Sequence, residues 1–594
     1  MADNLKVKGG EFLVKETDPA DVFIPEEFDE EQKMIGQTCE DFLEAEVFPV
    51  LDRLDAQEEG LMRSLLDKSG ELGLLAISIP EEYEGFGQSF ITAMYASEIM
   101  GAGYSYAVAF SCHTGIGTLP ILYYGNEEQR QKYIPKLASG EWVGAYCLTE
   151  PGAGSDANSG STKAVLTEDG KHYILNGQKM WITNAGFADV FTVFAKIDND
   201  RVLSAFIIEK GFEGLSLNPE EKKMGIKGSS TRQIFFNDCK VPVENLLGKR
   251  GEGFRIALNI LQMGRIKMGA SVIGAAKRAI YHSVVYANER KQFNCLIGEF
   301  GAIKYKLAEQ VILTFVMESA VYRASKDLDD AINFYVEKGE DKGRNTMEAF
   351  NQFGIEAAAM KVFASEALDY IVDEAVQIHG GMGYSAEMEV DKAYRDSRIN
   401  RIFEGTNEIN RILVADTIIK RGAKGEFPLM EEAEKVMEEL AGLADIKAGD
   451  ESYYDKKKRY VKNFKKVALI LMKAASDKFA SKLVHEQEII NNISDIVMQL
   501  YGAESALLRV QKLESMKGES AVVLYKQMLD VFTYDAASRI RKFALDSIYS
   551  FVYGDNRDKM LNGVKYFTCV EGVNVKEARR SIADMLISEN RYCF

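Results

Sequence analysis

One acidic residue of this chain stands in a setting that could make it a base. Glu404 lies between Phe403 and Gly405 in the segment RIFEGTNEINR, residues 401–411, just before a capped helix start. A carboxyl group with apolar neighbours has a raised pKa and becomes a usable base near neutral pH. The alternative is an exposed glutamate that the dipole of the following helix favours.

Two further segments could hold a flat ligand. AYCLTEPGAGSD, residues 145–156, ends a strand in a glycine-rich loop whose N–H groups can face phosphate or carbonyl oxygens. KMWITNA, residues 179–185, places Trp181 beside Thr183, an aromatic plate and a hydroxyl that suit a heterocycle. An ordinary turn and a core tryptophan are the alternatives. The loop lacks the third glycine of the dinucleotide fingerprint, so a bound nucleotide would not be held in Rossmann fashion.

Two helix ends add a cation and a pair of glycines. RKQF, residues 290–293, offers Arg290 to a phosphate, and QIHGGMGY, residues 377–384, offers close backbone approach at Gly380 and Gly381. A solvated arginine and a glycine helix cap are the alternatives.

Four domains must position these segments. Apolar residues at helical spacing before and after a stretch of short β-branched and aromatic runs predict a mainly α protein with a central β domain, of the α+β class. Within that stretch, Asn176-Gly177 predicts the turn of a hairpin. Four long helical segments, 256–289, 300–330, 345–378 and 387–422, predict an antiparallel bundle. The predicted domains are 1–141 (helical), 142–250 (β), 251–424 (four-helix bundle) and 425–594 (additional helical domain).

Composition narrows the class of protein. The 594 residues are too many for a single core, and the net charge of −18 argues against nucleic acid as a main partner. The seven cysteines are odd in number and form no CxxC, and the five histidines form no HExxH. We therefore expect reduced thiols, no metal site and a cytoplasmic location.

One segment of the sequence is compatible with contact to a membrane surface. The N-terminus is polar, without the apolar region of a signal peptide, and no apolar run approaches the roughly 20 residues of a membrane span. Residues 456–473, KKKRYVKNFKKVALILMK, combine basic residues with an apolar stripe. That stripe predicts either a core-facing helix or peripheral contact with the inner membrane surface.

In this order, the motifs YCLTEPGAGSD, MWITN, RKQF with QIHGGMGY, and RIFEGTNEINR resemble those of the acyl-CoA dehydrogenase family of flavoproteins. The resemblance covers residues 25–422, and the extra helical block makes the chain most similar to the very-long-chain branch and its bacterial relatives. It implies the family fold, with a β-barrel-like middle domain, and α,β-dehydrogenation of an acyl-CoA in fatty-acid β-oxidation. FAD is the implied cofactor and an electron-transferring flavoprotein the implied acceptor.

The resemblance also implies which residues bind the cofactor and that the protein is a homodimer, since one group of them would come from the neighbouring subunit. The β domain would contribute Tyr146, Leu148, Thr149, Gly154, Ser155, Trp181, Ile182 and Thr183; the neighbouring subunit Arg290, Phe293, Gln377, Gly380 and Gly381; and the segment after Glu404 would contribute Thr406 and Glu408.

Glu404 is then the implied catalytic base, and the implied substrate contacts are Ser155, Arg265, Gly405 and Cys112. Some branches carry the base in the segment that corresponds to LQMGR, residues 261–265, but the matching position here is Gly264, which cannot take a proton. Cys112 stands where medium-chain members have a larger residue that closes the pocket. The smaller side chain favours longer acyl groups.

Two other functions stay open from sequence. An acyl-CoA oxidase would pass the electrons to O₂, and none of these residues separates it from a dehydrogenase. A non-catalytic scaffolding protein on the same fold would have less reason to keep both Glu404 and the glycine-rich loop.

Overall fold

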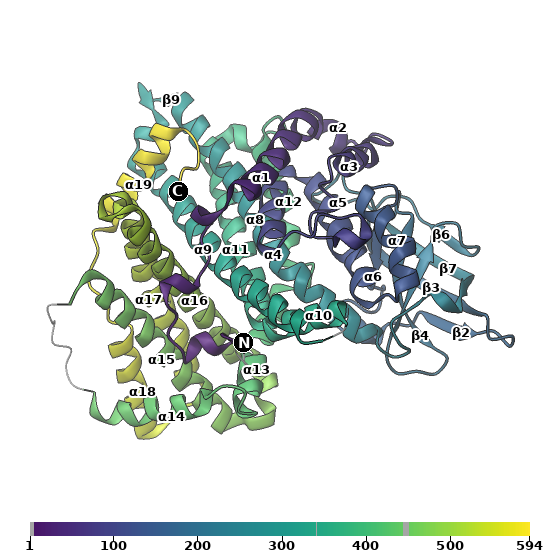
Figure 1. Cartoon of the computed structure of the whole chain (residues 1–594). Coiled ribbons are helices and arrows are strands. Elements are labelled where there is room, and N and C mark those ends of the chain that lie inside the picture. The colour runs from purple at the N-terminus through teal and green to yellow at the C-terminus, as the bar shows by residue number, and fades with distance from the viewer. Residues whose placement is uncertain (1–4, 340, 444–450) are drawn as a thin grey trace.

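The computed structural model describes residues 5–339, 341–443 and 451–594. A helical block comes first, followed by a set of strands, a group of long helices and a second helical block (Figure 1). This arrangement confirms the predicted fold class, mainly α with a central β domain. The β domain lies at one end of the molecule and the final helical block at the other (Figure 1).

The first block is a cluster of short helices with clear start signals. Asn126, for example, caps its helix by accepting a hydrogen bond from the backbone of Gln129, whose side chain bonds back. Two of the helices, α5 and α6, lead toward the strands. The helices are α1 (Glu30–Phe42), α2 (Leu51–Asp55), α3 (Leu61–Glu71), α4 (Phe90–Met100), α5 (Ser105–Cys112), α6 (Leu119–Tyr124) and α7 (Glu127–Ser139).

The β domain is one sheet with the strand order β6-β7-β3-β2-β4-β5-β8, and β1 pairs in parallel with β4. Its central strand β4 is almost wholly buried, which explains its continuous apolar sequence. The strands are β1 (Gly144–Cys147), β2 (Lys163–Leu166), β3 (His172–Thr183), β4 (Val190–Ile197), β5 (Ser204–Glu209), β6 (Leu215–Leu217), β7 (Thr231–Pro242) and β8 (Leu246–Leu247).

The predicted hairpin turn at Asn176-Gly177 is wrong. Both residues lie inside β3, where the pairing register with β7 shifts in a bulge. Glycine is required there because a Cβ on Gly177 would lie 2.5 Å from the Thr162 hydroxyl oxygen. The hairpin between β2 and β3 turns instead at Asp169-Gly170, where Gly170 has φ +68°.

The long helices α8 and α11 pack along each other and carry most of the bundle core, together with α9. Two of the four predicted segments are interrupted. The segment predicted at 345–378 breaks near Phe353, and the one predicted at 387–422 divides into α12 and α13 with Glu404 between them. The helices are α8 (Gly253–Glu289), α9 (Gly301–Glu337), α10 (Lys342–Gln352), α11 (Gly354–His379), α12 (Glu389–Ser397) and α13 (Asn407–Ala423), and a small hairpin of β9 (Lys291–Gln292) and β10 (Cys295–Leu296) follows α8.

The final block settles the interpretation of the apolar stripe at 456–473. Tyr460, Phe464, Val467 and Leu471 lie on α15 and are buried within the chain. The stripe faces the neighbouring helices of its own domain, so the prediction of membrane contact through it is wrong. The helices are α14 (Leu429–Glu439), α15 (Tyr453–Phe479), α16 (Gln487–Lys517), α17 (Val523–Phe551), α18 (Gly554–Phe567) and α19 (Val575–Glu589). No helix in the described ranges is both long and apolar enough to cross a membrane.

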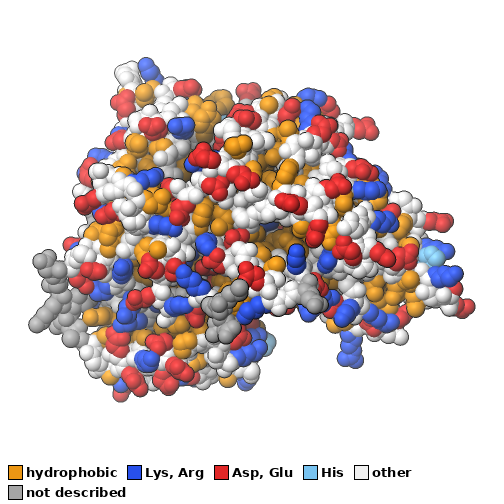
Figure 2. Space-filling model, viewed as in Figure 1, with side chains coloured by type: hydrophobic (Ala, Val, Ile, Leu, Met, Phe, Trp, Pro, Cys, Tyr) orange, Lys and Arg blue, Asp and Glu red, His pale blue; other side chains and the backbone are white. Residues whose placement is uncertain are grey.

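Residues 5–28, which we call the N-terminal strap, tie this block to the bundle; the strap is the purple segment that runs between α9 and α16 (Figure 1). Arg509 of α16 is 1% exposed and forms ion pairs with Glu26 of the strap (2.7 Å) and Glu318 of α9 (2.5 Å). Elsewhere on this face, acidic and basic side chains intermingle (Figure 2).

We predict that Arg509→Met weakens the junction between the final block and the bundle. Removing one partner from a buried ion pair typically costs about 3–5 kcal/mol. Here Glu26 would lose its counterion, whereas Glu318 would keep Lys277. The apparent midpoint of urea unfolding and the rate of limited proteolysis measure the effect. Arg53→Met, which breaks the exposed pair with Glu58, is the control and should leave both almost unchanged. Equal behaviour of the two variants would contradict the role of Arg509.

Candidate active site

Glu404 lies in a tight turn between a short 3₁₀ segment, Arg398–Arg401, and α13. Glu404 has φ +57° and Gly405 has φ +80°, so two successive residues adopt left-handed backbone. This conformation is costly for a glutamate and needs support from its surroundings. Thr406 then caps α13 by accepting a hydrogen bond from the backbone N–H of Ile409.

The carbonyl groups of the turn receive that support. Arg265 donates from Nε to the Glu404 carbonyl at 3.0 Å. Lys361 donates from Nζ to the Gly405 carbonyl at 2.8 Å, and Asn410 donates from Nδ2 to the same oxygen at 2.7 Å. Three side chains from three helices therefore hold the two left-handed residues in place.

The Glu404 carboxyl group lies directly against α8. A Cβ built on Gly264 would be 2.7 Å from Glu404 Oε2, so the absence of a side chain at Gly264 makes room for the carboxyl group. Oε2 is buried and has no hydrogen-bond partner within the described chain. Burial raises the pKa of Glu404 to about 7, against the opposing charges of Arg265 and Lys361. The group is thus poised to take and release a proton near neutral pH.

Three side chains from the first block and the β domain face Glu404. Tyr146 on β1 lies near enough that the charges of Glu404 and Arg265 affect the pKa of its phenol, which burial raises strongly. Cys112 at the end of α5 lies beside the hydroxyl group of Thr183, and burial together with Glu404 raises its pKa to about 12. The structure therefore brings Cys112, Tyr146, Thr183, Arg265 and Glu404 close to one another.

The glycine-rich loop and the end of β3 form an exposed surface beside these five residues. Trp181 is 53% exposed and has φ +60°, at a register shift that turns it out of the sheet, so it is not a core tryptophan. Gly152 and Gly154 have open space where a Cβ would stand, and Ser155 is exposed. Leu148 and Ile182 are buried beneath them, and Thr149 is half-buried.

A buried ion pair braces this loop. Lys179 of β3 is fully buried and donates to Glu150 Oε1 at 2.6 Å. Glu150 also accepts a hydrogen bond from the backbone N–H of Ser161 at 2.6 Å, and the pKa of its carboxyl group falls to about 2. An aromatic plate, hydroxyl groups and open glycine backbone on a braced loop fit a flat heterocycle with a phosphate chain.

The remaining predicted cofactor residues lie elsewhere. Gly264 and the end of α8 are separated by about 25 residues of helix, or roughly 37 Å. The five residues predicted to come from a neighbouring subunit, Arg290, Phe293, Gln377, Gly380 and Gly381, lie at or beyond that far end, next to β9 and away from the β domain (Figure 1). Phe293 is 89% exposed. One chain therefore does not bring these residues to Glu404. Glu408, on the first turn of α13, is exposed.

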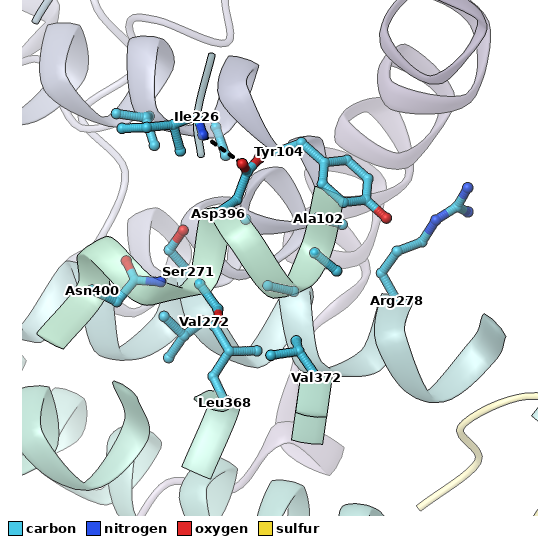
Figure 3. A pocket seen from close by; sticks show the side chains of 16 residues that line it. Ala102, Tyr104, Ile226, Ser271, Val272, Arg278, Leu368, Val372, Asp396 and Asn400 are labelled. Carbon is cyan, nitrogen blue, oxygen red and sulfur yellow. Dashed lines mark hydrogen bonds between the residues drawn. The ribbon is translucent and has the colours of Figure 1, made fainter. Parts of the chain in front are cut away.

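A cavity of about 60 Å³ lies between residues of the first block and helices of the bundle (Figure 3). Val108, one helical turn before Cys112, lines it, and so does Ser271, two turns after Gly264 on the same face of α8. Its walls also include Val272, Leu368 and Asp396, and the Asp396 carboxyl group accepts a hydrogen bond from the backbone N–H of Ile226 (Figure 3). Val108 and Ser271 therefore place the cavity one turn along α5 from Cys112 and two turns along α8 from Gly264.

Sequence reasoning missed the residues that support the site from behind. Lys361 and Asn410 hold the Glu404 turn, and Glu150 with Lys179 braces the loop. One signal was available, because Lys361 interrupts the apolar run AAAMKVFA of a core helix, where a lysine needs a partner. Nothing in the sequence next to Asn410, Glu150 or Lys179 indicates which residues they contact.

Family models match most of the chain. The N-terminal domain of acyl-CoA dehydrogenase matches residues 29–141, the middle domain 145–239 and the C-terminal domain 251–419. A further acyl-CoA dehydrogenase C-terminal domain matches residues 463–566.

Known proteins resemble the chain over nearly its full length. A probable acyl-CoA dehydrogenase of Bacillus subtilis is 44% identical over 98% of both chains. The human mitochondrial very long-chain specific acyl-CoA dehydrogenase is 36% identical over 83% of this chain and 75% of its own. A crystal structure of an acyl-CoA dehydrogenase from Bacillus anthracis, complexed with FAD, superposes with a TM-score of 0.96 at 44% identity and covers 99% of this chain and all of that one.

Proposed function

The chain belongs to the acyl-CoA dehydrogenase family, and on that premise we propose that it is an FAD-dependent enzyme that converts long-chain acyl-CoA thioesters to trans-2-enoyl-CoA. The observation that carries this proposal is the Glu404 carboxyl group, which is held against Gly264 with one oxygen unpartnered among the described residues and has Tyr146 and Cys112 as neighbours. The reaction removes two hydrogens from the substrate. Glu404 can take one of them as a proton, and a cofactor bound on the exposed surface around Trp181 can take the other.

Glu404 acts as the base that takes the α-proton of the thioester. With a pKa of about 7, it is ionised over the upper half of the physiological range, so the rate should rise as the pH passes through about 7. The backbone N–H of Glu404 donates to no acceptor in the described residues and is free to bond the thioester carbonyl, which makes the α-proton more acidic. Phe403 packs against the core beside it and helps to exclude water. FAD, when bound, supplies the acceptor for the β-hydrogen and its electron pair.

The chain's own residues fit FAD on two surfaces. Trp181, Thr183, Thr149 and the loop up to Ser155 would hold the ring and pyrophosphate within one subunit. The distant group around Arg290 and Gly380 would hold the remainder of a neighbour's cofactor, because the two surfaces are too far apart to share one molecule within a chain. We therefore propose a homodimer, whose exposed Phe293 and Tyr384 become covered.

A preference for long acyl chains rests on the cavity that Val108 and Ser271 line. Ser271 lies about 10 Å along α8 from Gly264, a distance that takes roughly eight methylene groups of an extended chain to cover. An acyl group of at least that length would reach the cavity with its tail, whereas a short one would leave it unfilled.

We propose an electron-transferring flavoprotein as the acceptor, following the family resemblance. An acyl-CoA oxidase is the alternative, and stoichiometric hydrogen peroxide formed in air with substrate would identify it. A non-catalytic scaffolding protein is the third hypothesis. Absence of flavin from the purified protein would favour it.

We predict that Glu404→Gln retains FAD but is reduced by acyl-CoA about a thousandfold more slowly, because glutamine cannot accept the proton. The measurement is anaerobic bleaching of the flavin by acyl-CoAs of graded chain length. A near-normal bleaching rate in this variant would mean that the base lies elsewhere.

Gly264→Ala should slow the reaction by about tenfold or more, because the new methyl group would displace the Glu404 carboxyl group. The matched control is Gly269→Ala on the same helix, where a Cβ meets its nearest neighbour at an ordinary 3.4 Å. Equal rates in the two variants would contradict the proposed packing of Glu404 on α8.

Val108→Phe should fill the cavity and lower the specificity constant for C16 acyl-CoA by about tenfold or more, with little effect on C6. Val165→Phe, at an exposed position of β2, is the control. An unchanged chain-length profile would show that the tail does not enter the cavity.

A further inference from the structure

Lys361 carries a buried amino group that the reaction itself does not use. It lies in the apolar middle of α11 and is fully buried. Its ammonium group donates to the carbonyl oxygen of Gly405 at 2.8 Å and to Oδ1 of Asn407 at 2.7 Å. No carboxylate forms a direct ion pair with it among the described residues, and burial lowers the pKa of its ammonium group to about 7.

The position of Lys361 explains why its burial is tolerated. Both of its hydrogen bonds reach the segment 405–407, directly after Glu404. Glu404 and Gly405 have left-handed backbone, a conformation that is strained for a glutamate and must be offset by contacts. Without Lys361, the Gly405 carbonyl would keep only the bond from Asn410.

The amino group of Lys361 also affects the ionisation of Glu404. The charged and titratable groups that face Glu404 come from four elements: Arg265 on α8, Lys361 on α11, Tyr146 on β1 and Cys112 on α5. Of these four groups, Arg265 is cationic and Lys361 is cationic when it is protonated. Lys361 in turn faces Arg265, Glu366 and Glu408 besides Glu404. Arg265 already bonds the Glu404 carbonyl, and Lys361, when it is protonated, is the second group that opposes the effect of burial on the carboxyl group.

We propose that Lys361 is a positioning residue: it holds the turn that presents Glu404 by hydrogen bonds to Gly405 and Asn407, and its protonated form favours the ionised form of the Glu404 carboxyl group. This inference rests on the proposed function and adds to it a residue that touches neither substrate nor cofactor. Because hydrogen bonding and charge are separable, two substitutions test the two roles.

Lys361→Gln retains a donor for the Gly405 carbonyl but removes the charge, and Lys361→Met removes both. In both variants the midpoint of the pH profile for single-turnover flavin reduction should rise by about one unit or more, since one unit corresponds to loss of a single close charge interaction. At pH 7 the rate should fall about fivefold, because the ionised fraction of Glu404 falls, and it should recover toward the wild-type value near pH 9. Lys361→Met should in addition be slower than Lys361→Gln at every pH.

A second readout does not depend on turnover. A 3-thia acyl-CoA has an acidic α-carbon but cannot complete dehydrogenation, so the absorbance change on its binding reports proton removal alone. Its pH dependence should shift upward in both variants by the same amount as the rate profile. The control is Lys306→Met, which removes the partner of Glu374 far from Glu404 and should shift neither profile.

Wild-type midpoints in both Lys361 variants would overturn the inference, even if Lys361→Met were slow, because a purely structural role lowers the rate equally at all pH values. If Lys361→Met fails to fold, the Lys361→Gln profile decides alone. A wild-type protein that no acyl-CoA reduces would contradict the proposed function instead, so the two failures are distinguishable.

Discussion

Keeping one carboxylate oxygen of Glu404 without a hydrogen-bond partner costs free energy, and the surrounding helices are arranged so that the chain can sustain it. Gly264 provides the space, and Arg265, Lys361 and Asn410 hold the backbone on which the carboxyl group stands. These contacts come from α8, α11 and α13, so the bundle must form before the site exists. The same isolation that makes the group expensive also raises its pKa to about 7 and makes it a base.

The β domain meets this site from the opposite side. A buried ion pair, Lys179 with Glu150, braces the loop, and a register shift in β3 turns Trp181 outward next to Thr183. A buried ion pair is weak evidence of stability, since its desolvation offsets much of its attraction, but it does define one arrangement of the loop. A defined loop is what a cofactor with a rigid ring and a phosphate chain requires.

The final helical block is joined to the bundle through polar as well as apolar contacts. The N-terminal strap lies along the junction, and Arg509 links it to α9 through Glu26 and Glu318. The basic and apolar segment 456–473 is used within the block, because its apolar residues are needed for the core around α15. An amphipathic helix must cover its apolar face with something, and the sequence alone does not say whether a neighbouring helix or a membrane covers it.

The sequence alone determined the order of helical and β regions, the family, Glu404 as the candidate base and the residues of the glycine-rich loop. These follow from local composition, periodicity and short motifs. Asn176-Gly177 was misread because a strong turn signal can also serve a bulge, and only the close approach of Thr162 reveals which. Tertiary structure alone decided that Gly264 makes room for Glu404, that Lys361 lies behind it, and that Arg290 and Phe293 stand roughly 37 Å along α8 from that position. Such facts depend on distances between residues far apart in the chain, and local sequence carries no record of those distances.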